Sequence, residues 1–354
     1  MMLPSYFFWL LFSLLYPAGS TDFERLEKLS DYQFFQGSLT DLSPAPGVYP
    51  YRVNTPLFSN YAEKLRFFKL PPGAKITYRD STVLDFPEGT VLIKNFYYPN
   101  DFRKPDKGKN ILETRLLVHE KSGWQTYPYV WNKEQTEAFY DPAGETWEVR
   151  YINASGKKIT TQYLVPNKNQ CKGCHLNGAR IVPVGPSARQ LSAMVEVDGV
   201  KKNQLQHWKE RGVLKGLPSL ADVPAGIVWD DPSTGSVNDR ARAYLDANCA
   251  HCHARQGPAN TSGLFLDFYE HNPAHLGVNK SPVAAGRGAG NREFDIVPGE
   301  PNKSILVFRM QTNDPAIAMP EIGREQVHQE GLALIEEWIR TNTFSKSTYD
   351  PRGK

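Results

Sequence analysis

Two Cys-x-x-Cys-His motifs constrain what this chain can fold into more than any other feature. The first is Cys171-Lys172-Gly173-Cys174-His175 and the second is Cys249-Ala250-His251-Cys252-His253. Two thiols three positions apart can each bond one vinyl group of the same porphyrin, and the histidine that follows can bind its iron. Each motif therefore has the attachment signature of c-type haem, and the sequence predicts two covalently bound haem c groups.

The two motifs use every cysteine of the 354-residue chain, so none is left for a disulfide framework. The predicted attachment and proximal-ligand residues are Cys171, Cys174, Cys249 and Cys252, with His175 and His253 as iron ligands. An alternative is that the four cysteines bind zinc. The gap of about 75 residues between the pairs is far wider than zinc-finger spacing, and zinc leaves the histidine after each pair unexplained.

The second axial ligands are less clearly marked. Met319, in Ala318-Met319-Pro320, is the predicted distal ligand of the second haem, because a thioether is a soft donor that favours ferrous iron. Met310 is the rival and is better placed to pack in a helix. For the first haem the sixth ligand stays open, and Met194 and His207 are the candidates that the sequence offers.

Several other polar residues receive simpler interpretations. Arg287 and Arg292, near a glycine-rich loop, are available to neutralise haem propionates. His251 stands between two thiols, where side chains usually point outward, so we expect it to be solvated. The histidines without a partner pattern are expected at the surface: His271, His275 and His328.

The pattern of the chain suggests four segments. Residues 1–20 carry no charged side chain and end in Ala18-Gly19-Ser20, which predicts a cleaved secretory signal peptide, with an uncleaved anchor as the alternative. Residues 21–165 contain short β-branched or aromatic runs separated by turn residues, which predict a β-rich domain. Residues 166–235 hold the first haem segment and a linker, and residues 236–345 form the predicted cytochrome c domain.

The expected fold class is multidomain α+β. Seven strand-like runs between Leu65 and Val165 predict an antiparallel β-sandwich or jelly-roll. In the C-terminal part, Ser236 and Asp239 form a helix-capping pattern before the second motif, and residues 326–340 repeat apolar side chains at helical spacing. A mainly α class I cytochrome c domain is therefore expected to follow the β domain.

The chain resembles a bacterial family of di-haem c-type cytochromes with a β-rich N-terminal region and a C-terminal class I cytochrome c domain. The likeness rests on both haem motifs and on the following stretches: Pro56-Leu57-Phe58-Ser59-Asn60-Tyr61-Ala62, residues 244–253, Ala284-Ala285-Gly286-Arg287-Gly288 and Met319-Pro320. The resemblance implies an exported redox protein and carries no settled catalytic activity.

The leading functional expectation is electron transfer in the periplasm or otherwise outside the cytoplasm, between donor and acceptor redox partner proteins. One alternative is a haem enzyme, peroxidase-like or a dehydrogenase subunit, with an open site at the first haem. Another is a binding module in which the β domain grips a partner and the haems conduct electrons. A net charge of +3 and the lack of a basic run argue against nucleic acid, and no membrane span is expected after signal removal.

Overall fold

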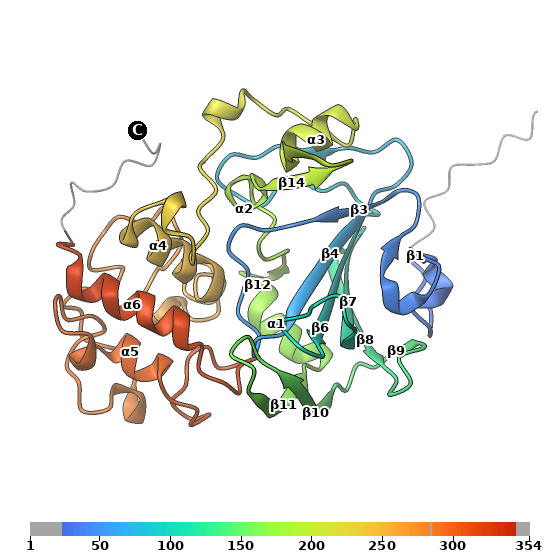
Figure 1. Cartoon of the computed structure of the whole chain (residues 1–354). Coiled ribbons are helices and arrows are strands. Elements are labelled where there is room, and N and C mark those ends of the chain that lie inside the picture. The colour runs from blue at the N-terminus through green and yellow to red at the C-terminus, as the bar shows by residue number, and fades with distance from the viewer. Residues whose placement is uncertain (1–22, 284, 345–354) are drawn as a thin grey trace, which may run out of the picture.

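A six-stranded antiparallel sheet lies at the centre of the N-terminal half (Figure 1). The computed structural model describes residues 23–283 and 285–344, so the predicted signal peptide, residues 1–20, lies outside the described residues. Neighbouring strands follow the order β3-β4-β6-β7-β8-β9. The bounds of these strands are β3 Val48–Tyr51, β4 Glu63–Lys69, β6 Val91–Pro99, β7 Lys109–Glu120, β8 Gly123–Trp131 and β9 Ala138–Tyr140.

Both faces of this sheet are covered, because successive side chains of a strand point to opposite faces. On β4, Phe67 belongs to an apolar cluster with Leu29 and Phe34 from the N-terminal segment. Its neighbour Phe68 belongs to a different cluster, with Trp208. The segments that supply these covers include β1 Phe35–Gln36, β2 Ser43–Pro44, α2 Ala188–Leu191 and α3 Gln204–Glu210.

A separate antiparallel ribbon covers one end of the sheet. It consists of β10 (Glu145–Ile152) and β11 (Lys158–Val165), which pair along their whole length. Side chains of the ribbon such as Tyr163 pack with Phe96 and Tyr98 of the central sheet. The chain leaves β11 directly into α1 (Lys168–His175), so this ribbon fixes where the first motif begins.

The C-terminal part is built around three helices that share one apolar core. They are α4 Val237–Asn248, α5 Ile305–Met310 and α6 Gln329–Thr341. Leu245 of α4 packs with Ile335 and Trp338 of α6, and all three side chains are almost completely buried. A helix was expected before the second motif, and α4 confirms it. The helix expected over residues 326–340 is also present, but it begins three residues later, at Gln329.

The remaining elements are short. The other strands are β5 Ile76–Thr77, β12 Leu176–Asn177, β13 Arg180–Ile181, β14 Met194–Val197, β15 Val200–Asn203 and β16 Leu214–Lys215. The 3-10 helices are η1 Ser30–Tyr32, η2 Leu39–Asp41, η3 Leu220–Asp222, η4 Pro232–Thr234, η5 Asn260–Ser262, η6 Gly286–Ala289 and η7 Pro301–Lys303.

The predicted fold class is wrong in both halves, although the seven strand-like runs do form strands. Among the described residues the central strands make one large sheet, and the other sheets are two-stranded, so no second sheet packs on it as a sandwich or jelly-roll requires. Helix accounts for 22% and strand for 28% of the structure. In the described residues between 236 and 344, three α-helices and three short 3-10 helices alternate with long turn-rich loops, and they form no large mainly α cytochrome domain.

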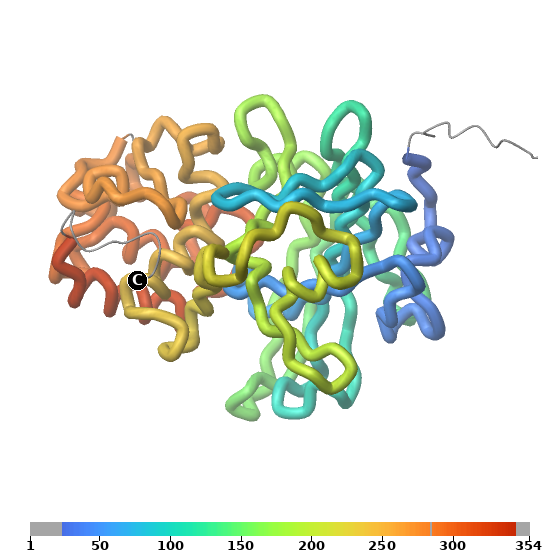
Figure 2. The backbone as a smooth tube through the Cα atoms, turned by 90° about the horizontal axis from the view of Figure 1, so that it is seen from above, coloured from blue at the N-terminus to red at the C-terminus, as the bar shows by residue number. Residues whose placement is uncertain are grey.

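The two halves of the chain are in direct contact (Figure 2). Asn60, just before β4, accepts hydrogen bonds from the backbone N–H groups of Glu325 (2.7 Å) and Gln326 (3.1 Å). Arg189 of α2 pairs with Asp246 of α4. Within the described residues, no helix is both long and apolar enough to cross a bilayer.

Candidate functional site

The first motif forms most of helix α1. Asn167 caps this helix by accepting a hydrogen bond from the N–H of Gln170 (2.8 Å), while the Gln170 side chain accepts one from the N–H of Asn167 (2.9 Å). Such a reciprocal cap satisfies two backbone donors that a helix start leaves unpaired. Within the helix, Cys171 and Cys174 lie three positions apart and face the same cavity. The local sequence therefore presents both thiols on one side.

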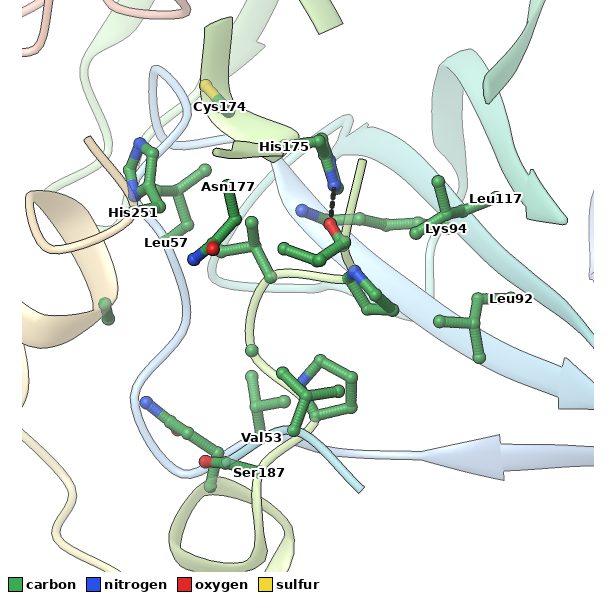
Figure 3. Close-up of a pocket in the computed structure, with 18 of the residues that line it drawn as sticks. Val53, Leu57, Leu92, Lys94, Leu117, Cys174, His175, Asn177, Ser187 and His251 are labelled. Carbon is green, nitrogen blue, oxygen red and sulfur yellow. Dashed lines mark hydrogen bonds between the residues drawn. The ribbon is translucent and has the colours of Figure 1, made fainter. Parts of the chain in front are cut away.

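His175 is the last residue of α1 and is held in one orientation. Its Nδ1–H donates a hydrogen bond to the carbonyl oxygen of Val182 at 2.8 Å (Figure 3). The other ring nitrogen, Nε2, then carries the free electron pair, and this arrangement is how proteins commonly orient an iron or zinc ligand. Burial lowers the pKa of His175 to about 4, so the imidazole is neutral at pH 7.

A cavity of about 480 Å³ opens beside this helix. Both thiols and the imidazole of the first motif line it, and its other walls come from the central sheet, residues 182–190 and the end of α4. The two lining cysteines have raised pKa values because they are buried, so they are protonated thiols at neutral pH. The cavity thus brings together one histidine and two cysteines from a single helix.

A row of three cations crosses the sheet wall of this cavity. Arg66 on β4 lies directly opposite Lys94 on β6, and Lys94 lies directly opposite Arg115 on β7. All three line the cavity. Like charges in directly opposed positions repel each other and destabilise a sheet. A negative charge beside the row would reduce this repulsion.

Only part of that charge is compensated by the protein. Arg115 forms two hydrogen bonds with the buried carboxylate of Glu113, at 2.6 and 2.5 Å. In the described part of the chain, Arg66 and Lys94 have no carboxylate within ion-pair distance. Burial, with Arg66 and Arg115 nearby, lowers the pKa of Lys94 well below its usual value. The cavity wall therefore favours an anionic group.

The second motif follows α4, whose start is capped as the sequence predicted. Ser236 and Asp239 form the reciprocal cap, and Cys249 ends the helix. Burial raises the pKa of Cys249 and Cys252 to about 12. The imidazole of His253 has its Nδ1 3.2 Å from the hydroxyl oxygen of Ser262.

The two motifs touch, although they are far apart in sequence. The Cys252 thiol donates to the carbonyl oxygen of Gly173, with sulfur and oxygen 3.3 Å apart. Close by, the N–H of Gly178 donates to the carbonyl of Gln256 at 2.7 Å. Sequence analysis gave no signal for this contact, because it depends on how the C-terminal part docks on the sheet.

The structure separates the candidate axial ligands. Met310 is buried in the apolar core, as expected for a packing residue. Met319 lies on the loop after α5, and its N–H donates to the carbonyl of Arg309 (3.0 Å). Neither Met194, which is 59% exposed on β14, nor His207 of α3 lines the cavity of the first motif.

Other residues also differ from their predicted environment. The arginines proposed for propionates have protein partners: Arg287 pairs with the exposed Asp314, and Arg292 donates to the carbonyl of Asn302 at 2.9 Å. His328 was expected at the surface, but its ring stacks on Phe58 in a largely buried position.

The expectation that His251 is solvated is also wrong. Its side chain lines the cavity of the first motif (Figure 3), and its Nδ1 is buried with no hydrogen-bond partner in the described structure. Sequence analysis missed this because the motif alone does not show what lies outside it.

The four cysteines do not form a common metal site. Among the described residues, no group of three or more His, Cys, Asp or Glu side chains is arranged to hold a metal ion. The zinc alternative, which requires such a group, has no support in this geometry.

No protein-family model, curated protein or solved structure matches this chain. The predicted membership of a family of di-haem cytochromes with a class I cytochrome c domain is therefore wrong. No family model matches, and the structure has few helices. Among the described residues, no cluster of side chains is arranged to hold a metal ion. The two motifs and their surroundings are therefore the features of this chain that point to a function.

Proposed function

We propose that this chain is an exported c-type cytochrome with two covalently bound haem groups, and that it transfers electrons between redox partner proteins. The observation that carries the proposal is the cavity of the first motif. It is lined by both thiols, by the oriented His175 imidazole and by the cation row of Arg66, Lys94 and Arg115.

The residues of this cavity suit a porphyrin better than a bare metal ion. Two thiols from one helix supply two attachment points, and the Nε2 of His175 supplies an iron ligand. Arg66 and Lys94, which have no carboxylate partner in the described structure, match the two propionate carboxylates of a haem in number. A propionate beside Lys94 would favour its charged form. Apolar side chains such as Leu92 and Leu117 complete the wall. When bound, haem supplies a one-electron Fe(III)/Fe(II) couple.

The second motif supports the same assignment with its own residues. Cys249 and Cys252 would hold the group covalently, and His253 would bind the iron through the nitrogen that does not face Ser262. Met319 remains the candidate for the opposite axial position. The contact between Cys252 and Gly173 would place the two groups next to each other, which favours electron transfer within the chain.

Export is part of the proposal because haem attachment to such motifs takes place outside the bacterial cytoplasm. The uncharged, apolar N-terminal residues supply the matching signal in the sequence. Redox proteins of the same compartment are then the partners, as donors and acceptors of single electrons.

The test is the mass of the mature protein made in a host competent for cytochrome maturation. Attachment adds each S–H across one vinyl group, so all four thiols become thioethers and the protein gains the mass of two porphyrins. We expect no free thiol after denaturation. A bare polypeptide mass with four reactive thiols would refute the proposal.

Paired variants assign the two groups to their motifs. Replacing Cys171 and Cys174 with serine should remove one porphyrin, and the same change at Cys249 and Cys252 should remove the other. Retention of both groups in either double variant would contradict the assignment.

A further inference from the structure

The first motif supplies one axial ligand of an iron, and the side chain that completes its coordination has to line the same cavity. The sequence candidates, Met194 and His207, do not line it. Among the cavity-lining side chains, the ones with an unprotonated nitrogen suited to iron are His175, His251 and, when neutral, Lys94. His175 follows directly after Cys174 and takes the proximal position.

We propose that His251, which stands between the two cysteines of the second motif, is the second axial ligand of the iron held at the first motif. This inference rests on the proposed function. It assigns bis-histidine coordination to the first haem and leaves His253 and Met319 for the second.

The first support is the state of the His251 ring. It lines the cavity, while its Nδ1 is buried without a hydrogen-bond partner in the described structure. Buried polar atoms of native proteins are nearly always paired, so an unpaired one calls for a missing partner. A bond from Nδ1 to the iron would give this nitrogen the partner that it lacks.

The second support is the contact that holds His251 in place. The thiol of Cys252, the next residue, lies 3.3 Å from the carbonyl oxygen of Gly173, which is part of the first motif. On the other side, Ala250 also lines the cavity. The short turn between the two cysteines of the second motif is therefore packed against the first. Figure 3 shows His251 and His175 among the side chains that line the same cavity, on different segments.

Lys94 is the competing ligand, but its position fits another role. It is the middle member of the cation row, and its ammonium group lies over the ring of Phe96 at 4.7 Å. With Arg66 beside it, Lys94 is placed to pair with a propionate. His251 has no such competing role.

The consequence is that both axial positions of the first iron are filled by the protein. This disfavours the alternative of a haem enzyme with an open site there. It also means that one turn of three residues, 250–252, serves both haems.

The test uses optical and electron paramagnetic resonance spectra of the ferric two-haem protein. The parent protein should contain two low-spin haems. His251→Leu, which leaves the Cys-x-x-Cys-His motif intact, should convert half of the iron to high spin with both porphyrins still attached. In His251→Gly, added imidazole should restore the low-spin signal.

Controls separate this inference from the proposed function. His207→Leu should match the parent, because His207 does not line the cavity. The inference is overturned if His251→Leu keeps two low-spin haems, if the parent already has one high-spin haem, or if Lys94→Met causes the conversion instead. Absence of porphyrin from the parent protein refutes the proposed function itself, and mass measurement detects that separately.

If His251→Leu fails to retain the first porphyrin, His251→Met provides the decisive variant. It keeps an axial donor but exchanges imidazole for a thioether, which raises the reduction potential. One of the two potentials should rise, and unchanged potentials would overturn the inference.

Discussion

His328 is a histidine kept neutral by its neighbours. Its Nδ1 lies 2.9 Å from the hydroxyl of Tyr244, and its ring stacks on Phe58 with centroids 4.2 Å apart. Burial lowers its pKa to about 4. Because the pKa in the unfolded chain is higher, near 6.5, the unfolded state binds a proton more readily than the folded state between these two values.

The stability of the protein should therefore fall as the pH drops from about 6.5 to about 4, and His328 should account for on the order of 2–3 kcal/mol of that loss. In His328→Gln this contribution is absent, so the free energy of unfolding should depend less on pH within the window. Denaturant unfolding of both proteins at several pH values measures the difference. Identical pH profiles would contradict the assignment.

Met319 is tested by its own substitution. Met319→Ala should abolish the sulfur-to-iron charge-transfer band near the red end of the ferric spectrum, because the thioether is lost. Met310→Leu is the matched control and should leave the band unchanged, since Met310 packs in the apolar core. Persistence of the band in Met319→Ala would point to another ligand.

At the scale of residues, the sequence predicts correctly the features that depend on neighbouring residues. It does not predict the features that depend on residues far away in the chain. The capping pair Ser236 and Asp239 was predicted from spacing alone and is confirmed. His328 and His251 were both assigned to the surface. Residues far away in the chain bury both of them, and for His328 one such residue is Phe58. The local sequence pattern around either histidine gives no information about these contacts.

At the scale of elements, α1 is a short helix that carries the proposed haem attachment at the first motif. Its eight residues include the whole first motif, and its start depends on Asn167. Asn167→Ala should lower the free energy of unfolding by about 1 kcal/mol, the usual cost of removing a cap. Denaturant unfolding measures this, and peptide mapping should show reduced porphyrin attachment at the first motif compared with the second. Unchanged stability would show that the cap is dispensable.

The cation row leads to a prediction about the haem proposed at the first motif. Arg66→Gln removes a positive charge from the cavity wall, which stabilises ferric iron relative to ferrous iron. One of the two reduction potentials should fall by roughly 60 mV, the one-electron equivalent of a tenfold change in equilibrium constant. Lys69→Gln is the control, because Lys69 lies three positions along the same strand and faces the opposite side of the sheet. Equal shifts in both variants would contradict a specific role for the row.

The strands themselves were predictable, and their assembly was not. The β-branched and aromatic runs between residues 64 and 165 do form strands, because the pattern of turns and apolar residues is local information. Their arrangement as one sheet with two covered faces depends on the cover that α2 and α3 provide from beyond the first motif. The same holds for the row formed by Arg66, Lys94 and Arg115, which exists only once the strand register is known.

At the scale of the whole molecule, Arg189 joins the two halves. It is 3% exposed, pairs with Asp246 and lies over the ring of Phe268 at 4.0 Å. Arg189→Ala would leave Asp246 without its ion-pair partner and remove this packing. The free energy of unfolding should fall by about 3 kcal/mol.

The matched control is Arg150→Ala, which breaks the exposed pair with Glu148 and should change stability by less than about 1 kcal/mol. Chemical unfolding monitored by tryptophan fluorescence compares the two variants. Equal losses in the free energy of unfolding would show that the ion pair between the two halves stabilises the protein no more than an exposed ion pair does.

The contact between Cys252 and Gly173 leads to an expectation about the order of the proposed haem attachment and the docking of the two halves. Cys171 is only 6% exposed, and the second motif packs against the first. Cys171 is the one buried cysteine of the four, and the other three are partly exposed. If the proposed porphyrins are joined to the chain, we expect attachment at Cys171 to precede the docking of the C-terminal part on the sheet.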